Sequence, residues 1–342
     1  MSRLTRTTIA HGALALMLLA GCASAPEHKP AAAAASSPSA AVKYAAIPKD
    51  KDSDLKLYAA DGRILKGADA LGRMQREAGL ILWLAGNQFF AMDDVVAAFQ
   101  KQHSGVAVGL ITLPPGLLLN AIQGGGWTYQ GQSFPGLPDV YASVNLNHLK
   151  ALKEAGLMET YAVYLHNEME LMVAQGNPKR ITGIRDLVRP DVRTSLPNPV
   201  NEGIMRFYGR KVLERHGIWN QISAGKECAS CQTTPNNWFT SVHHRETPER
   251  ILDGRSDTGI VWVTETMEAK RDGAKVDSVR LPPQDSLVDE VSYAIGSLTK
   301  SGNKAMADRY IRFLATAEAK QAYSKYGFVT ASDAELRLKP IP

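Results

Sequence analysis

Three successive units of strand, turn and helix limit the possible folds of this chain more than any other feature. Residues 80–84 form an apolar run typical of a buried strand, residues 86–88 a polar turn, and residues 92–99 the apolar stripe of a helix. Two further strands are predicted at 106–111 and 139–143, each followed by a helical segment. Alternating strands and helices predict an α/β fold with a parallel sheet and right-handed crossovers.

A second informative stretch runs from residue 240 to residue 265. Pro248 suits the first position of a helix, because that position needs no N–H, so Thr247 is the predicted N-cap. Residues 259–263 then form an apolar run suited to a strand that is covered on both faces.

Polar residues flank this predicted helix and strand. His243, His244 and Arg245 precede the helix, and Thr264 and Glu265 follow the strand. In open α/β sheets, ligands bind beside the carboxyl ends of strands and the N-termini of helices. Both polar groups are therefore expected to face one binding crevice.

The N-terminus carries the pattern of an exported protein. Residues 1–21 contain two arginines and an apolar run that is too short to span a membrane, for which about 20 residues are needed. The tail Leu-Ala-Gly-Cys, ending at Cys22, resembles the bacterial lipobox, which implies a lipid on Cys22 and a periplasmic protein anchored to the cell membrane or outer membrane. A plain secretory peptide that is cleaved nearby is the alternative.

Charge and motifs exclude several classes of function. Loss of the two arginines with the signal peptide lowers the formal charge from +5 to +3, and no basic run interleaved with aromatic residues suggests a nucleic-acid partner. No nucleophile elbow, Walker loop or HExxH pattern is present in the sequence, and Gly124–Gly126 ends a predicted helix instead of starting one. The sequence thus predicts a binding protein that is not an enzyme and needs no cofactor.

The order of elements resembles the molybdate/tungstate-type periplasmic solute-binding proteins, a branch of the type II periplasmic binding-protein fold. The similar stretches are Gly86-Asn87-Gln88, Pro115-Gly116, Leu137–Ser143, His166–Val173 with Gly176-Asn177-Pro178, Gly259–Glu265, and the closing segment Ser301–Phe328. Together they cover roughly residues 79–328. The resemblance implies two α/β lobes with hinge-crossing strands and an inter-lobe cleft, a small-molecule or ion ligand, an ABC transporter permease as partner, and a monomer.

The expected organisation follows from this resemblance and from composition. It comprises a lipoprotein signal peptide (1–21), a flexible tether (22–54), an N-terminal extension of unknown role (55–78), a discontinuous first lobe (79–166 and 289–332), a second lobe (167–288) and a C-terminal tail (333–342). The candidate ligand-binding residues are Asn87, Gln88, Pro115, Gly116, Ser143, Asn145, Asn198, Glu202, His243, His244, Arg245, Thr264 and Glu265.

The identity of the ligand stays open. A family member of this type binds an oxyanion such as molybdate or tungstate with neutral donors and helix N-termini. An ionised Glu202 or Glu265 at 4 Å from such an anion would cost about 4 kcal/mol at an effective dielectric constant near 20. Either these side chains turn away, or the ligand is a metal ion, a metal chelate or an amine-bearing metabolite.

His243 and His244 have two interpretations. Adjacent side chains on an extended chain point in opposite directions, so at most one histidine would contact a ligand or a metal ion. Alternatively, both are loop residues that cap the following helix or bond a neighbouring carbonyl. Arg245 would either pair with a nearby carboxylate on the surface or bind an anion.

Cys228 and Cys231 form the other constellation. In an oxidising compartment this pair predicts a short-loop disulfide, while a redox-active pair and a metal site shared with His243 or His244 stay open. The alternative function is therefore a periplasmic accessory or sensor protein that handles a metal ion or a redox partner through these four residues.

Overall fold

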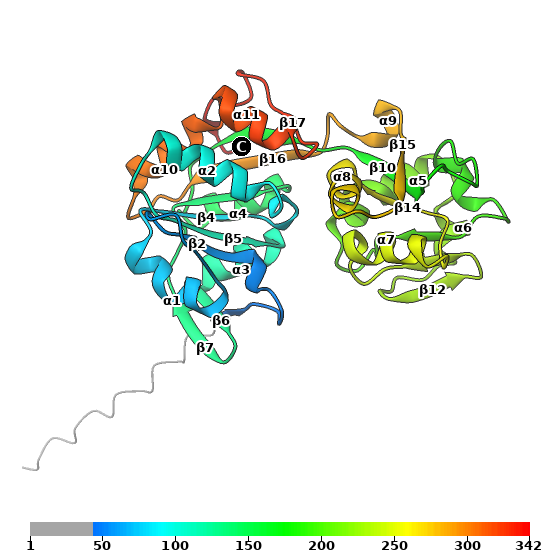
Figure 1. The fold of residues 1–342 in the computed structure, drawn as a ribbon, viewed down its shortest axis with the longest axis horizontal. Coiled ribbons are helices and arrows are strands. Elements are labelled where there is room, and N and C mark those ends of the chain that lie inside the picture. Colours follow the sequence, from blue (N-terminus) through cyan, green and yellow to red (C-terminus); the bar gives the residue numbers. More distant parts are fainter. Residues whose placement is uncertain (1–43) are drawn as a thin grey trace, which may run out of the picture. The chain divides into compact units, whose positions relative to one another are not determined.

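The computed structural model describes residues 44–342. The signal peptide, the Cys22 lipidation site and most of the predicted tether lie outside the described residues. Two lobes make up the described part, each built on one large sheet (Figure 1). This α/β architecture with a two-lobe arrangement confirms the predicted fold class. Among residues 44–342, no helix is both long enough and apolar enough to cross a membrane.

Lobe 1 contains a nine-stranded sheet in the order β17-β9-β16-β8-β4-β5-β2-β3, with β18 paired to β9. The strands are β2 (Leu55–Tyr58), β3 (Ile64–Lys66), β4 (Leu80–Ala85), β5 (Val108–Leu113), β8 (Val140–Ser143), β9 (Thr160–His166), β16 (Ser292–Ser297), β17 (Val329–Thr330) and β18 (Lys339–Pro340). A small sheet adds β1 (Ala45–Ala46), β6 (Gly126–Tyr129) and β7 (Gln132–Pro135). Strands β5, β4 and β8 are parallel neighbours, as the alternating pattern predicts.

Helices and short 3₁₀ turns complete lobe 1. They are η1 (Asp52–Asp54), α1 (Gly67–Glu77), η2 (Gly86–Gln88), α2 (Met92–Gln102), α3 (Pro115–Gly124), α4 (Leu146–Glu154), α10 (Lys304–Phe313) and α11 (Ala317–Ser324). Residues 55–78, the predicted N-terminal extension of unknown role, form β2, β3 and α1. Strand β2 pairs antiparallel with β5. It therefore extends the main sheet of this lobe.

Lobe 2 contains a six-stranded sheet in the order β12-β13-β11-β14-β10-β15. Its strands are β10 (Met169–Ala174), β11 (Thr194–Leu196), β12 (Cys231–Thr234), β13 (Asn237–Phe239), β14 (Thr258–Trp262) and β15 (Val276–Arg280). Its helical segments are η3 (Ile184–Val188), the π-helix η4 (Ile204–Gly209), α5 (Arg210–Arg215), α6 (Trp219–Ser223), α7 (His243–Leu252), α8 (Val263–Arg271) and α9 (Pro283–Ser286). Strand β11 runs parallel to both β13 and β14.

The chain passes between the two sheets twice. Strand β9 belongs to the first sheet and β10 to the second, and the return passage lies between β15 and β16. The N–H of Asn167 donates to the carbonyl of Val291 at 3.2 Å, so the two crossing segments are hydrogen-bonded to each other. The residue numbers at which the lobes divide stay a prediction.

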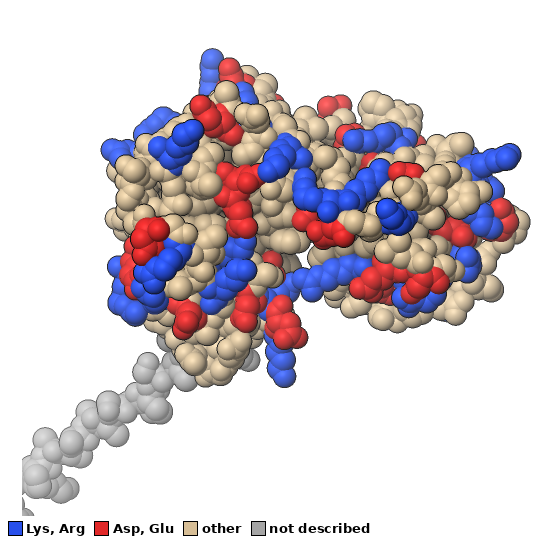
Figure 2. All heavy atoms as spheres, viewed as in Figure 1, with Lys and Arg blue, Asp and Glu red and all other residues tan. Residues whose placement is uncertain are grey.

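Charged side chains of both signs are mixed over the surface. Figure 2 shows Lys and Arg interspersed with Asp and Glu across the face drawn, without an extended basic patch on that face. Large basic patches are what nucleic-acid binding requires, because phosphate contacts supply most of its affinity.

Close packing at Gly259 fixes how lobe 2 is assembled. A Cβ atom at Gly259, in the middle of β14, would lie 2.2 Å from the backbone oxygen of Ser195 and 2.5 Å from a methyl carbon of Thr247. Thr247 belongs to α7 and Ser195 to β11. The missing side chain therefore lets the sheet and α7 approach each other.

We expect Gly259→Ala to lower the free energy of unfolding by about 1–3 kcal/mol, because the added methyl group overpacks this contact. Urea denaturation would measure the change. Gly302→Ala is the matched control, since nothing lies within 4 Å of a Cβ there, and it should cause no loss. Equal stability of the two variants would contradict the packing argument.

Candidate functional site

Helix α7 begins at His243, so the predicted N-cap at Thr247 is wrong. The carboxylate of Glu246 accepts the Ser241 N–H at 2.6 Å and the Trp238 indole N–H at 2.6 Å, which stabilises an earlier start. Pro248 lies inside the helix, where it gives up one backbone hydrogen bond. The two histidines consequently lie on the first turn of a helix and not on an extended chain.

The carboxyl ends of β11, β13 and β14 meet at one edge of the lobe 2 sheet, because these strands are parallel. Glu202 follows β11, His243 follows β13, and Glu265 lies in the first turn of α8 directly after β14. The topology thus brings together three residues that lie far apart in the sequence. We call Glu202, His243, His244 and Glu265 the strand-end cluster.

His243 lies between the two carboxylates of this cluster. Its Nδ1 is 2.5 Å from Oε2 of Glu202, and its Nε2 is 3.0 Å from Oε1 of Glu265. The side chain of His243 is only 6% exposed, that of Glu265 4% and that of Glu202 14%. The second oxygen of Glu265 accepts the Trp262 N–H at 3.1 Å, which fixes this carboxylate against the start of α8.

The charges of the cluster follow from these contacts. Burial alone would lower the pKa of His243, but the two adjacent carboxylates outweigh it and raise this pKa to about 10. Burial would likewise raise the pKa of Glu202, but the charge of His243 holds it below its ordinary value. His243 is therefore an imidazolium ion at neutral pH, paired with two acids.

His244 completes the cluster as a neutral ring. Burial lowers the pKa of His244 to about 4. One ligand atom from each of His243, His244 and Glu265 lies within 4.8 Å of the others. The prediction that at most one histidine faces the site rested on an extended backbone, and the helix removes that restriction. Arg245 is exposed and lies outside this group.

A second set of polar residues links the two lobes. The side-chain amide of Asn87 donates to the hydroxyl of Tyr293, and the amide of Asn167 donates to the same hydroxyl at 3.3 Å and to Oγ1 of Thr264 at 3.1 Å. Tyr208 donates to the carbonyl of Val144 at 3.1 Å. All these groups are uncharged donors or acceptors.

The sequence predicted Asn87 and Thr264 as site residues but missed Asn167 and Tyr293. Both missed residues are fully buried and lie on the two crossing segments. Each segment predicted to cross between the lobes contains a polar residue. This pattern could have indicated Asn167 and Tyr293 as site residues.

The site residues that the sequence predicted in lobe 1 lie at the carboxyl ends of three strands. Asn87 follows β4, Pro115 and Gly116 follow β5, and Ser143 and Asn145 lie at the end of β8. Oγ of Ser143 is 2.9 Å from Nδ1 of His148 and accepts the Asn145 N–H at 3.0 Å. Burial lowers the pKa of His148, which favours the uncharged form of its ring. Pro115 and Gly116 open α3, so the Gly116 N–H has no acceptor within the helix. This edge offers neutral hydrogen-bonding groups.

Two of the predicted ligand-binding residues, Gln88 and Asn198, are buried and make hydrogen bonds inside the protein. The side chain of Gln88 is fully buried, and its oxygen accepts from the hydroxyls of Tyr164 at 2.7 Å and Tyr323 at 3.3 Å. Asn198 is also fully buried, and its amide donates to the carbonyl of Thr240 at 2.8 Å. Both amides hold neighbouring segments in place.

The cysteines do not join the histidines. Cys228 and Cys231 lie beside each other as a cysteine pair. Within residues 44–342, the group that could hold a metal ion contains His243, His244 and Glu265 and neither cysteine. The described residues therefore bring the two histidines together without either cysteine, and this arrangement does not support the joint site that the accessory or sensor function would use.

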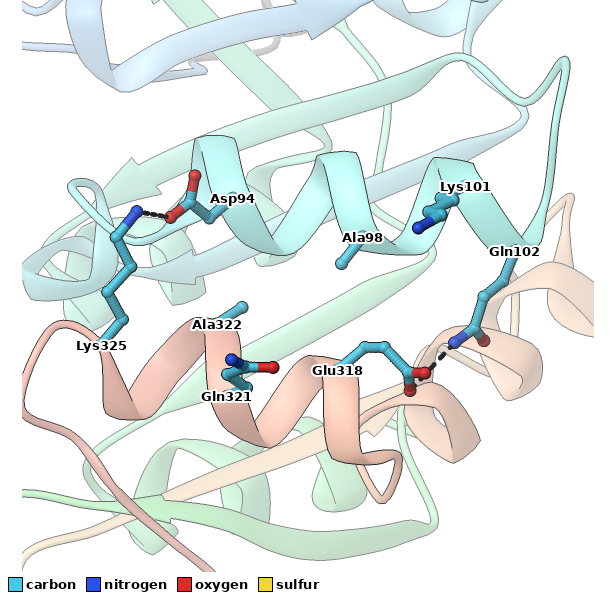
Figure 3. A pocket seen from close by; sticks show the side chains of 8 residues that line it. All are labelled: Asp94, Ala98, Lys101, Gln102, Glu318, Gln321, Ala322 and Lys325. Carbon is cyan, nitrogen blue, oxygen red and sulfur yellow. Dashed lines mark hydrogen bonds and ion pairs between the residues drawn. The ribbon is translucent and has the colours of Figure 1, made fainter.

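A groove of about 460 Å³ lies elsewhere, between α2 and α11 of lobe 1 (Figure 3). Lys325 pairs with Asp94 at 2.5 Å at one end, and Gln102 donates to Glu318 at 3.4 Å at the other. The alanines Ala98 and Ala322 point toward each other between them (Figure 3). Four of the polar side chains that line the groove therefore bind one another.

A family model for bacterial extracellular solute-binding proteins matches residues 80–329. The chain belongs to this family. Members are binding proteins and not enzymes, which confirms the prediction that the chain is not a catalyst. The resemblance noted from the sequence motifs is confirmed by the same match.

Curated relatives of this solute-binding protein carry anion-binding names. The sulfate-binding protein of Synechococcus elongatus is 24% identical over 204 residues, which are 56% of this chain and 57% of the relative. The molybdate-binding protein ModA of Mycobacterium tuberculosis is 25% identical over 192 residues, 56% of this chain and 65% of the relative. The alignments thus span less than two thirds of either relative.

Solved structures support the fold. The periplasmic molybdate-binding protein of Azotobacter vinelandii superposes with a TM-score of 0.57 at 15% identity, over 74% of this chain and 100% of that one. The sulfate-binding protein SubI of Mycobacterium tuberculosis gives a TM-score of 0.52 at 19% identity, over 75% and 88% of the chains. At such low identities, the likeness establishes the two-lobe fold alone.

We expect the charges of His243 and Glu202 to be strongly coupled. His243→Gln should lower the free energy of unfolding by about 3–5 kcal/mol, because it leaves buried carboxylates without a partner. Adding Glu202→Gln should recover part of this loss, which a double-mutant cycle from denaturation curves would measure. The exposed pair Lys211 and Glu290 is the control and should couple by no more than about 1 kcal/mol. Additive effects at His243 and Glu202 would contradict the pairing.

Proposed function

We propose that this solute-binding protein captures a small oxyanion outside the cytoplasm and delivers it to an ABC importer. Two observations support an anion: the relatives are named for sulfate and molybdate, and uncharged donors gather at the strand ends of both lobes. The candidate oxyanions are molybdate, tungstate and sulfate.

The neutral donor set is the observation that carries the proposal. Asn87, Gly116 and Thr264 each lie just after a parallel strand, at or near the start of a helical segment. Helix N-termini supply N–H groups and partial positive charge, so they can hold an anion without a counter-ion. The hydrogen bonds through Asn167 and Tyr293 connect Asn87 to Thr264, which places donors from both lobes in one chain of contacts.

The two carboxylates that argued against an oxyanion are paired with His243. The imidazolium ion of His243 contacts both carboxylates and offsets negative charge at this edge. The N-terminal ends of α7 and α8 add partial positive charge at the same edge. The cost of placing an anion near this edge is therefore lower than for two unpaired carboxylates.

We predict that Asn87→Asp weakens oxyanion binding by at least about 100-fold, since a new carboxylate near the anion costs about 4 kcal/mol per charge pair at 4 Å. Isothermal titration with molybdate, tungstate and sulfate would measure the dissociation constants. Asn220→Asp makes the same chemical change at an exposed position of α6 and should leave the dissociation constants unchanged.

Two results would overturn this proposal. Wild-type protein that binds none of the three oxyanions would remove the assigned ligand class. Equal affinities of the Asn87→Asp and Asn220→Asp variants would place the anion away from the strand ends of lobe 1.

We also propose that lipid on Cys22 anchors the protein as a monomer at the membrane surface, and that Cys228 and Cys231 form a structural disulfide. The Leu-Ala-Gly-Cys tail of the signal peptide supports the anchor. Cys22→Ala should move the protein from the membrane fraction to the soluble periplasmic fraction, as followed by immunoblotting. Cys228→Ala is the control that should keep it in the membrane fraction. Retention of Cys22→Ala with the membranes would refute the anchor.

A further inference from the structure

The strand-end cluster has the arrangement of side chains that metal-binding histidines use. Glu202 faces Nδ1 of His243 at 2.5 Å, which turns Nε2 toward Glu265. Histidines that bind metals characteristically donate their second ring N–H to a carboxylate, which fixes the ring and its tautomer. We propose that Nε2 of His243, one ring nitrogen of His244 and one carboxylate oxygen of Glu265 bind a divalent transition metal ion.

The distances fit such a site after small movements. One ligand atom of each of these three residues lies within 4.8 Å of the other two. Around tetrahedral Zn²⁺, with bonds of about 2.0–2.2 Å, ligand atoms lie about 3.3 Å apart. The ligand atoms that are farthest apart would therefore have to move closer together when the ion binds. Two imidazoles and one carboxylate are also ligands that zinc accepts.

The elements that carry the ligands are rigid. His243 and His244 begin α7, and Glu265 lies in the first turn of α8, where its second oxygen already accepts the Trp262 N–H. Gly259 lies in β14, which comes between α7 and α8 in the sequence. Its lack of a side chain lets α7 pack closely against β14. A site built on helix starts and held by buried neighbours keeps its geometry better than a site on loops.

Charge favours a divalent ion at this place. The carboxylates of Glu202 and Glu265 lie on opposite sides of the His243 ring. A metal ion would lie between Nε2 of His243 and the carboxylate of Glu265, in place of the hydrogen bond that joins them. Both carboxylates would then attract the positive charge of the ion.

This inference is independent of oxyanion capture, because its ligands are distinct from Asn87, Gly116 and Thr264. It also differs from a site shared with cysteines, since the group contains neither Cys228 nor Cys231. Zn²⁺ is the probe for affinity, and Co²⁺ reports coordination geometry through its visible absorption.

The test is isothermal titration of the metal-free full chain, purified in detergent, with Zn²⁺. We expect one Zn²⁺ per chain. His244→Ala, which removes a half-buried ligand, and Glu202→Gln, which removes the orienting carboxylate, should each weaken binding by about 10–100-fold. His103→Ala, on lobe 1, is the matched control and should bind as the wild type does.

Co²⁺ spectra provide the second readout. A visible absorption band of tetrahedral intensity that is lost in His244→Ala would support the site, with circular dichroism confirming that this variant is folded. Wild-type protein without Zn²⁺ binding, or binding that is equal in His244→Ala, Glu202→Gln and His103→Ala, would overturn the proposal. Titration of the same metal-free sample with molybdate separates the two proposals, because either binding event can fail without the other.

Discussion

The buried ion pairs of His243 with Glu202 and Glu265 are the interaction on which the architecture of lobe 2 depends. They join the segments that follow β11, β13 and β14, so three parallel strands share one polar contact at their carboxyl ends. Removing one partner of a buried pair is costly because an uncompensated charge remains in a medium of low polarity. The interaction therefore fixes the starts of α7 and α8 relative to each other.

The same constraint shapes what the protein can bind. Parallel strands end at one edge of each sheet, and helix N-termini follow directly, so each lobe presents donors at its edge. Lobe 1 contributes neutral groups around Asn87 and Gly116, whereas lobe 2 contributes both the neutral Thr264 and the charged cluster. An anion would be held by the neutral donors, and a cation would be held by the cluster.

Much of the fold could be predicted from the sequence, because apolar runs such as residues 80–84 and 259–263 are long enough to identify buried strands. The start of α7 could not be predicted in this way. The contacts of Glu246 with Ser241 and Trp238 decide it, and they outweigh the preference of Pro248 for a first helical position.

The candidate site was predictable only in part. The order of strands indicated Asn87, Thr264 and Glu265, because these residues follow strands whose carboxyl ends must share an edge. Side-chain direction was not visible in the pattern: Gln88 turns into the core toward Tyr164, and Asn198 bonds to Thr240. Such choices depend on hydrogen-bond partners that are distant in sequence and come together only in the folded chain.

The most direct test of anion capture at the strand ends is a crystal structure with tungstate, recorded at a tungsten absorption edge. We predict one strong anomalous peak within hydrogen-bond distance of the Asn87 side chain, the Gly116 N–H and Thr264. A peak elsewhere on the protein, or no peak from crystals grown with saturating tungstate, would contradict oxyanion capture at this edge.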